Sequence, residues 1–361
     1  MKLGIDFGTT RTVVTAVDDA RHPVASFDEG GEFHAYIPGI AALRGRDLLL
    51  GWEAARAQAE GTCEHALRSI KREIQTRMPD DEVLPGITAL ELVTRFLGEV
   101  RTAILTRSNL TARDPLEVMI SAPANAASRQ RWLTLEAFRA AGFHPIGLLN
   151  EPTAAAVEFA HHHLRELGKK SPKRYVVVYD LGGGTFDTSA VSLEGRHFEL
   201  IAAEGIARLG GDDFDEHVLD AACTALGIVP PLRDAASLER AREAKETLRA
   251  TSKKLLVDLG PHGTTAIDAG LLYLHCEPLI ERTIAQTDLL FDKLRTRGID
   301  PDDPRELGGI YLVGGAAAFP AVAKRLRARF GKKLQLAPQP FAATAIGLAI
   351  AADPEAHVMS R

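Results

Sequence analysis

One short pattern occurs twice in this chain of 361 residues, and it constrains the fold more than any other feature. An apolar run ends in Asp, an apolar residue and Gly, and a small polar loop and a second strand-like run follow. The first copy is centred on Asp6 and the second on Asp180, 174 residues later. Each copy predicts a β-hairpin, because β-branched residues flank a glycine-containing turn. A repeat of this length predicts two similar halves built from one supersecondary unit.

Strand and helix patterns alternate after each hairpin. Continuous apolar runs predict a strand in each half, and apolar residues at helical spacing predict helices behind it. Alternation of this kind favours an α/β fold with a mostly parallel, covered sheet in each half. The predicted elements are strands over 117–121 and 309–313 and helices over 128–141, 150–163, 320–330 and 341–352.

Two more charged stretches, 52–107 and 212–295, interrupt the core pattern at corresponding places and are typical of helical insertions. We therefore expect two lobes, each with a core and an inserted subdomain, joined by a linker near residues 168–173. The expected lobe I covers 1–168, with core 1–36 and 108–168 and insertion about 37–107. The expected lobe II covers 169–361, with core 169–211 and 296–361 and insertion about 212–295.

Composition narrows the class of protein. Hydrophobic residues make up 45% of the chain, and the net charge of −5 makes nucleic acid a weak candidate partner. Three cysteines far apart in the sequence fit a reducing compartment. No signal-peptide layout is visible, and the apolar stretch 341–352 is too short to span a bilayer. We expect a cytoplasmic protein that binds neither nucleic acid nor membrane.

Glycine-rich loops follow three of the predicted strands, at 8–10, 182–185 and 314–315. Glycine lets backbone N–H groups approach a phosphate closely. Carboxylates beside phosphate repel it unless a hard cation lies between them, and Mg²⁺ keeps its waters in such sites. Asp6, Asp180 and Asp187 therefore predict a magnesium site bound mainly through water, and the alternative is that each aspartate only forms a local turn. The loops match neither a P-loop nor a Rossmann site.

Several longer motifs now become recognisable. Residues 5–10, 150–156, 179–187 and 209–215, and more loosely 312–315, resemble the ATPase domain of the 70-kDa heat-shock (DnaK-type) chaperones. The resemblance implies an actin-like/hexokinase-like ATPase fold. Its two lobes are built from duplicated ribonuclease-H-like sheets with helices on both faces, and each lobe carries an inserted subdomain. It also implies ATP or ADP and Mg²⁺ as ligands.

The same resemblance assigns roles to individual residues. It implies that Lys71 reaches the γ-phosphate, that Glu151 orients water, and that Thr185 and Asp180 complete the catalytic set. Asp6, Asp180 and Asp187 correspond to the metal site. The implied nucleotide contacts are Gly8, Thr9, Thr10, Arg11, Gly182, Gly183, Gly184, Gly210, Gly211, Arg242, Lys245, Glu246, Arg249, Gly314, Gly315 and Ala316. Pro123 and Arg131 match a relay from Glu151, or are a turn proline and a solvated arginine.

The purine pocket departs from the family pattern. Arg242, Lys245, Glu246 and Arg249 fall on one face of a predicted helix, but only Lys245 keeps the family residue type. Alanines at 316–318 replace the polar residue and the arginine that stacks on adenine in the family. Arg249 could supply a substitute stacking contact, and Arg242 and Glu246 could simply neutralise each other. We expect intact phosphate binding with weaker or different adenine selectivity.

The expected function is that of a chaperone-like protein that binds ATP and hydrolyses it slowly. Its nucleotide state would control lobe closure and the binding of an unidentified protein partner or co-chaperone. The sequence ends at Arg361 without a peptide-binding domain, which favours a stand-alone ATPase domain. The alternatives are a filament-forming actin-like protein, a nucleotide sensor without turnover, and a small-molecule kinase, for which no additional catalytic base is visible.

Overall fold

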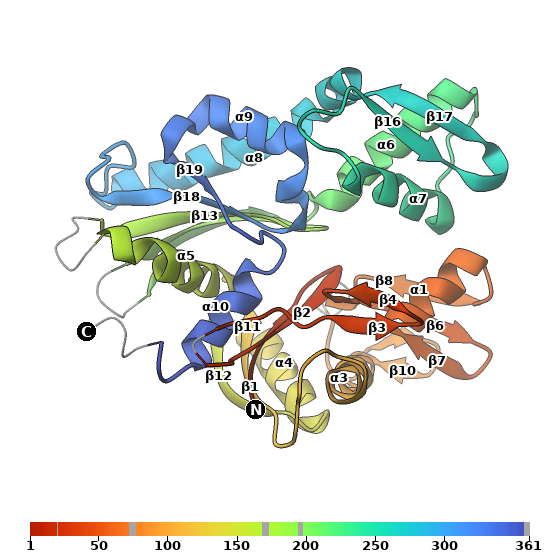
Figure 1. The fold of residues 1–361 in the computed structure, drawn as a ribbon, viewed down its shortest axis with the longest axis horizontal. Coiled ribbons are helices and arrows are strands. Elements are labelled where there is room, and N and C mark those ends of the chain that lie inside the picture. The colour runs from red at the N-terminus through yellow and green to blue at the C-terminus, as the bar shows by residue number, and fades with distance from the viewer. Residues whose placement is uncertain (20, 72–76, 168–172, 194–197, 357–361) are drawn as a thin grey trace. The chain divides into compact units, whose positions relative to one another are not determined.

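The computed structural model describes residues 1–19, 21–71, 77–167, 173–193 and 198–356 (Figure 1). Most of the predicted linker, 168–172, lies outside these residues. The chain divides into two compact units. Unit 1 comprises Met1–Ser171, Gly195–Leu200 and Ala342–Arg361, and unit 2 comprises Pro172–Glu194 and Ile201–Phe341.

Unit 1 is built on a five-stranded sheet in the order β12-β11-β1-β2-β5. Its centre is the predicted hairpin, whose strands are antiparallel, and β1 also pairs in parallel with β11. Apolar side chains of β1, including Leu3 and Ile5, are fully buried in the core. The bounds are β1 (Lys2–Phe7), β2 (Arg11–Ala16), β5 (Ile37–Pro38), β11 (Glu117–Ala122) and β12 (His144–Asn150).

Unit 2 repeats this arrangement in a sheet ordered β15-β14-β13-β18-β19. The second predicted hairpin forms its antiparallel centre, and β13 pairs in parallel with β18 as β1 does with β11. The expected duplication of one α/β unit is therefore confirmed. The bounds are β13 (Tyr175–Leu181), β14 (Phe186–Ser192), β15 (Leu200–Ile206), β18 (Leu307–Val313) and β19 (Leu334–Leu336).

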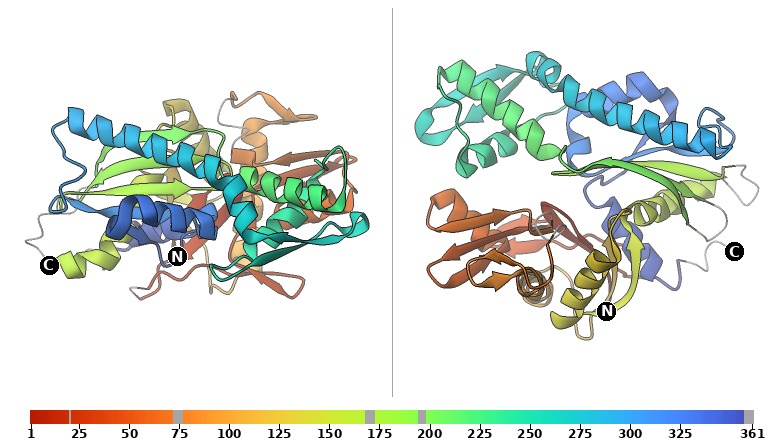
Figure 2. Two further views of the ribbon diagram at one scale, coloured as in Figure 1. Left: turned by 90° about the horizontal axis from the view of Figure 1, so that it is seen from above. Right: turned by 180° about the vertical axis from the view of Figure 1, so that it is seen from behind.

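The helices repeat in the same order. One helix precedes β11 or β18, a second follows it, and a third follows β12 or β19. These helices are α3 (Ala89–Thr106), α4 (Ser128–Ala140) and α5 (Glu151–Leu167) in the first half, and α8 (Ala269–Thr296), α9 (Pro320–Phe330) and α10 (Ala343–Ala352) in the second. Figure 2 shows the long α8 running across one face of its sheet.

Helix α3 belongs to the core of unit 1, although the sequence analysis placed it in an insertion. Its buried stripe includes Phe96 and Val100, which share one apolar cluster with Phe7 of β1. Phe7 and Phe96 pack with ring centroids 5.8 Å apart. The sequence could not show this contact, because an amphipathic pattern shows that one face of a helix is covered but not by what.

Helix α10 lies in unit 1, whereas the sequence analysis assigned residues 342–361 to the second half. It packs against α5 and β1 (Figure 1). The approach is close, because a Cβ atom on Gly347 would lie 1.8 Å from the carbonyl oxygen of Ala154, and one on Gly4 would lie 2.4 Å from that of Ala345. Small residues thus let the third helices of the two halves meet in unit 1.

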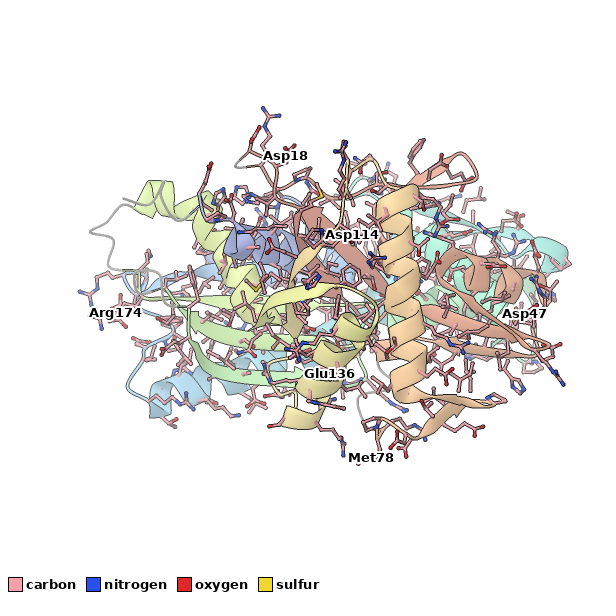
Figure 3. The ribbon with its side chains drawn as sticks, turned by 90° about the horizontal axis from the view of Figure 1, so that it is seen from below. Asp18, Asp47, Met78, Asp114, Glu136 and Arg174 are labelled. Carbon is pink, nitrogen blue, oxygen red and sulfur yellow. The ribbon has the colours of Figure 1, made fainter. Side chains whose placement is uncertain are left out.

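The insertion of unit 1 was predicted to be mainly helical, but it contains several β-strands. Residues 40–68 form a three-stranded sheet ordered β7-β6-β8 around α1, and two short hairpins flank it. Figure 3 labels Asp47 at the β6–β7 turn and Glu136 on α4. The bounds are β3 (Phe27–Glu29), β4 (Glu32–His34), β6 (Ile40–Arg44), β7 (Asp47–Leu50), α1 (Gly51–Glu60), β8 (His65–Arg68), β9 (Glu82–Leu84) and β10 (Ile87–Thr88).

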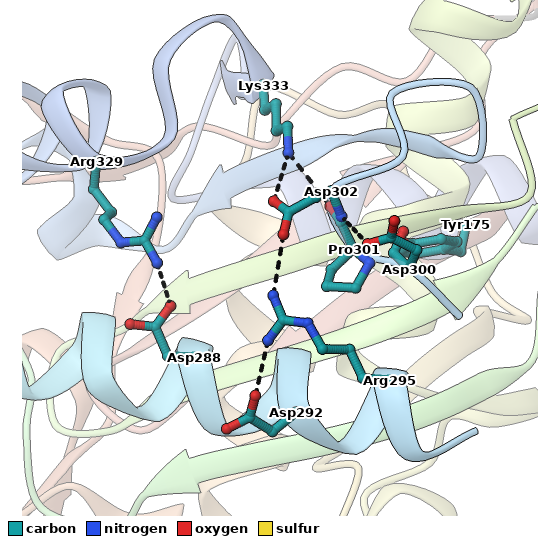
Figure 4. A network of polar contacts seen from close by, with 9 residues as sticks. All are labelled: Tyr175, Asp288, Asp292, Arg295, Asp300, Pro301, Asp302, Arg329 and Lys333. Carbon is teal, nitrogen blue, oxygen red and sulfur yellow. Dashed lines mark hydrogen bonds and ion pairs between the residues drawn. The ribbon is translucent and has the colours of Figure 1, made fainter. Parts of the chain in front are cut away.

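The insertion of unit 2 has two helices and a hairpin, α6 (Gly211–Leu226), α7 (Ala235–Glu246), β16 (Lys254–Asp258) and β17 (Thr264–Asp268). At the other end of this unit, Arg295 contacts Asp292 and Asp302, and Lys333 contacts Asp302 (Figure 4). Exposed ion pairs of this kind each contribute about 0–1 kcal/mol. Within the described part of the chain, every helix is too short or too polar to cross a membrane.

Candidate functional site

The turn of the first hairpin is shaped for close approach by a ligand. The Gly8 N–H donates to the Arg11 carbonyl at 3.1 Å, and a Cβ on Gly8 would lie 2.4 Å from that oxygen. Thr9 and Thr10 form the tip of the turn and are partly exposed. Their N–H groups donate to no acceptor among the described residues, so both are available to an anion.

A chain of backbone hydrogen bonds connects this turn to Lys71. The Gly39 N–H donates to the Thr10 carbonyl at 2.9 Å, and the Ile70 N–H donates to the Gly39 carbonyl at 2.9 Å. Ser69 has a φ of +65°, which is uncommon for a residue other than glycine and is typical of a locally constrained backbone. Lys71, only 8% exposed, is thus placed by the same backbone that holds the turn.

Lys71, Glu151 and Asp6 form one charged cluster in unit 1. The Lys71 ammonium group makes an ion pair with Glu151, and the Ser121 hydroxyl donates to Asp6 at 3.0 Å. Burial raises the pKa of Asp6 to about 6, while the positive charge of Lys71 opposes this and the negative charge of Glu151 adds to it. Three groups that can exchange protons or stabilise negative charge therefore meet at the end of the sheet.

The residue that precedes Glu151 is fixed by a hydrogen bond. Glu151 is the first residue of α5 and directly follows Asn150, the last residue of β12. Arg131 donates to the Asn150 side chain at 2.6 Å and to the Pro123 carbonyl at 3.4 Å. Arg131 is therefore a bound bridge and not the solvated arginine that was one of the two alternatives. Its part in a relay stays a prediction.

The turn of the second hairpin is closed by the same kind of backbone hydrogen bond as the first. The Gly182 N–H donates to the Thr185 carbonyl at 3.0 Å, which matches the bond that closes the first turn. Asp180 and Asp187 are direct cross-strand partners, so both carboxylates lie on one face of the sheet. At the corresponding place in unit 1, Asp6 faces Val13. The second hairpin is therefore the richer in carboxylates.

Glycines pack other segments against this second turn. The Gly211 N–H donates to the Gly182 carbonyl at 2.9 Å, at the start of α6. A Cβ on Gly210 would lie 2.6 Å from the Gly184 nitrogen. Gly314 has a φ of +90°, and a Cβ there would lie 2.5 Å from a carboxylate oxygen of Asp180. Gly315 and the buried Ala316 follow in the short helix η2 (Gly315–Ala318).

The residues predicted to contact the purine have different surroundings from those expected. Lys245 is buried, pairs with Asp215 at 2.5 Å and donates to the Gly211 carbonyl at 3.0 Å. Burial raises the pKa of Asp215, and Lys245 opposes the shift. Arg242 lies 3.5 Å from Glu246, as the neutralising alternative predicted. Lys245 thus anchors the start of α6.

The placement of Arg249 on the same helix face was wrong. Helix α7 ends at Glu246, because Thr247 turns back and its N–H and hydroxyl both donate to the Ala244 carbonyl. Arg249 folds onto the end of the helix, donating to the carbonyls of Glu246 at 2.9 Å and Leu248 at 3.0 Å. One nitrogen of its guanidinium group therefore satisfies two carbonyls at and just beyond the end of the helix.

The predicted site residues thus form two sets. Unit 1 brings together the first turn with Asp6, Lys71 and Glu151, and unit 2 brings together the second turn with Asp180 and Asp187. Sequence reasoning missed Ser121, Asn150 and Asp215. Ser121 could have been found, since it ends the strand predicted beside β1. No group of three or more His, Cys, Asp or Glu side chains in the described residues could hold a metal ion directly.

Two sheets of identical strand order, each with a glycine turn at the centre, define the actin-like ATPase fold. Residues 99–357 match the family described as "Hsp70 protein". The chain belongs to the Hsp70 family. It is 32% identical over 378 residues to the "Chaperone protein HscA homolog" of Burkholderia multivorans (strain ATCC 17616 / 249), and 31% identical over 375 residues to that of Azoarcus sp. (strain BH72). Each match covers 98% of this chain and 58% of the relative, so the chain spans less than two thirds of these chaperones.

Proposed function

We propose that this protein binds ATP and ADP with Mg²⁺ and hydrolyses ATP slowly, and that the bound nucleotide controls lobe closure and the affinity for a protein partner. The observation that carries the proposal is the Lys71–Glu151 ion pair beside Asp6 and the first glycine turn. The relatives that are named chaperones support the partner-binding part of the proposal.

In this proposal the residues of unit 1 act on the terminal phosphate and on water. Backbone N–H groups of Thr9 and Thr10 bind phosphate oxygens. Lys71 stabilises the negative charge that grows on the transferred phosphoryl group. Glu151, kept near Lys71 by their ion pair, accepts a hydrogen bond from the attacking water and orients it.

Unit 2 contributes the carboxylates. Asp180 and Asp187, which face each other across the hairpin, bind the hydrated metal ion, and the Thr185 hydroxyl contacts phosphate or water. Mg²⁺, when bound, offsets the repulsion between these carboxylates and the phosphates. Asp6 adds a third carboxylate from unit 1.

The test is calorimetric titration with ATP and ADP, with and without Mg²⁺, followed by single-turnover phosphate release. The wild type should bind both nucleotides more tightly with Mg²⁺ and release phosphate. Lys71→Ala should bind ATP but lose release at least about hundredfold. Lys253→Ala, at an exposed lysine, is the matched control.

Each outcome separates this proposal from its alternatives. Binding without phosphate release in the wild type would replace the ATPase with a nucleotide sensor. Light scattering that rises with protein concentration only when ATP is present would favour a filament-forming protein. Absence of nucleotide binding would overturn the proposal.

A further inference from the structure

A histidine near the N-terminus contacts the segment that follows the last helix. His22 lies in the loop between β2 and β3, and Asp353 directly follows α10. Nε2 of His22 lies 3.2 Å from Oδ2 of Asp353, although 331 residues separate them in the sequence. The two side chains are only 6% and 3% exposed. The contact therefore joins an early and a late part of the chain that both belong to unit 1.

Asp353 holds the turn after α10 as well as the loop. Its N–H donates to the Ile350 carbonyl at 3.2 Å, in the last turn of the helix. Its Oδ1 accepts a hydrogen bond from the Glu355 N–H at 2.8 Å, while Oδ2 faces His22. A carboxylate only accepts hydrogen bonds, so the proton of the neutral His22 ring lies on Nε2. One buried carboxylate thus connects the end of α10 to the β2–β3 loop.

Two further histidines and a glutamate of α5 lie beside this contact. The His161 ring packs edge-on against His22 with ring centroids 5.6 Å apart, and the His162 ring lies 5.7 Å from that of His161. Nε2 of His162 lies 3.1 Å from Oε1 of Glu158, whose side chain is 1% exposed. Helix α5 packs against α10, so three segments that are distant in sequence meet here (Figure 1).

The charged groups that act on His22 come from the ends of both helices. Burial lowers the pKa of His22 below its ordinary value of 6.5, because a charged ring would lose its hydration. The Asp353 carboxylate opposes this shift, and the positive charge of protonated His162 adds to it. The other charged side chains of the loop and of the turn after α10 are exposed, namely those of Asp18, Asp19, Arg21 and Glu355.

Acid therefore weakens the packing around His22. The folded protein binds a proton at this ring less readily than the unfolded chain does, so the free energy of unfolding falls where only the unfolded chain is protonated. The stability that neutral His22 contributes is complete above about pH 6.5 and is lost as the pH falls below that value. Histidine is the side chain whose charge ordinarily changes in this range.

We infer that His22 and Asp353 form a pH-sensitive contact that keeps the end of α10 docked on unit 1 at neutral pH and releases it in mildly acidic solution. Release here means loss of the hydrogen bonds of residues 353–355, while the rest of unit 1 stays folded. The contact does not involve nucleotide, so its failure in the test below would leave the proposed function unchanged.

The test is hydrogen exchange of the full chain without nucleotide at about pH 8 and pH 5.5, with each rate corrected for the intrinsic effect of pH. Protection of the Asp353 and Glu355 amides should fall at least about fivefold at the lower pH, since a shift of one pKa unit corresponds to tenfold. His22→Gln can still donate to Asp353 but does not titrate, so its protection should be equal at both pH values. His144→Gln, at an exposed histidine of β12, is the matched control and should behave like wild type.

Titration of the His22 ring by NMR gives a second readout that general damage to the fold would not mimic. Asp353→Asn removes the neighbouring negative charge, so the pKa of His22 should fall. His162→Gln removes the neighbouring positive charge, so the pKa of His22 should rise. The two variants should therefore move the titration of one ring in opposite directions.

Each outcome supports or overturns the inference. Equal protection of the wild type at both pH values overturns it, and so does a pH dependence in His22→Gln that matches the wild type. It is also overturned if Asp353→Asn and His162→Gln move the titration of His22 in the same direction or leave it unchanged. Should His22→Gln not fold, exchange of the wild type and the two NMR titrations decide.

Discussion

The two hairpin turns are closed by the same backbone hydrogen bond, but they are surrounded by different side chains. In unit 1 the turn lies near a lysine, an arginine and a single aspartate, and in unit 2 two facing aspartates lie below a turn of glycine and threonine. Each unit also contains a buried lysine paired with a carboxylate, Lys71 with Glu151 and Lys245 with Asp215. The hydrogen bonds that close the two turns are alike, while the side chains differ. In the proposed function the set in unit 1 is phosphate-directed and the set in unit 2 is metal-directed.

The sharpest test of this comparison is the pair in unit 2, which we interpret as structural. Lys245→Met leaves Asp215 buried without its partner and removes the bond to Gly211, so unfolding should cost about 3–5 kcal/mol less than in wild type. Adding Asp215→Leu should restore most of the loss. Urea unfolding measures both, with the exposed Lys253→Met as control. A loss below about 1 kcal/mol for Lys245→Met would contradict a structural role.

The pair in unit 1 should behave in the opposite way. Glu151→Gln keeps an oxygen that accepts from Lys71 but removes the base, so single-turnover phosphate release should fall about hundredfold. Stability should change little, because the Glu151 side chain is 18% exposed and water reaches it. Glu136→Gln, at a half-buried glutamate of α4 that pairs with Arg139, is the control. Unchanged phosphate release in Glu151→Gln would remove the catalytic assignment.

The metal-directed set can be tested through its carboxylates. Asp187→Asn keeps the shape of the side chain but removes a charge that unit 1 lacks at Val13. We expect the Mg²⁺-dependent part of ATP affinity to fall about tenfold, while affinity without Mg²⁺ stays equal or rises as repulsion is lost. Calorimetry at several Mg²⁺ concentrations measures the change. Equal losses with and without Mg²⁺ would indicate a distorted hairpin instead.

The smallest expected effect concerns the pH dependence of stability. Asp6 has a pKa of about 6 in the folded protein against about 3.8 unfolded, so the folded state binds more protons between these values. The stability contributed by protonated Asp6 is complete below about pH 3.8 and is lost as the pH rises through 6. Asp6→Asn stays neutral, so its Tm relative to wild type should rise by a few degrees from pH 4.5 to 8.

These melts are made in EDTA without nucleotide, so that no ligand binds the carboxylate. Asp303→Asn is the matched control, because the Arg305 side chain lowers the pKa of Asp303 to about 2 and that group stays ionised across this range. A difference in Tm between Asp6→Asn and wild type that does not change with pH would show that burial does not shift Asp6.

Local patterns predicted much of the fold. β-Branched runs around Gly8 and Gly182 marked both hairpins, and apolar spacing marked most of the helices around them. The patterns could not show which element packs against the apolar face of each helix or strand. Helix α3, placed in an insertion from the sequence, packs against core residues of unit 1, and no strands were predicted over residues 40–50, which form β6 and β7.

The site divides in the same way. Lys71 and Glu151 were predicted from motifs, and their ion pair was not, because it joins residues 80 apart in sequence. Arg249 has the correct spacing for a helix face, yet Thr247 ends the helix before it. Tyr36 belongs to no recognised motif, and only the structure shows that the Arg11 guanidinium group lies over its ring.

The seating of α10 beside α5 and β1 affects how the chain is made as well as how it folds. Most of unit 1 precedes unit 2 in the sequence, but its covering helix is translated only after all of unit 2. During synthesis the backbone around Gly4 and Ala154 stays uncovered while some 170 intervening residues emerge and organise themselves, against the usual order in which N-terminal domains finish first. A nascent chain halted before residue 343 should therefore expose a protease-sensitive first half that becomes resistant once α10 is released.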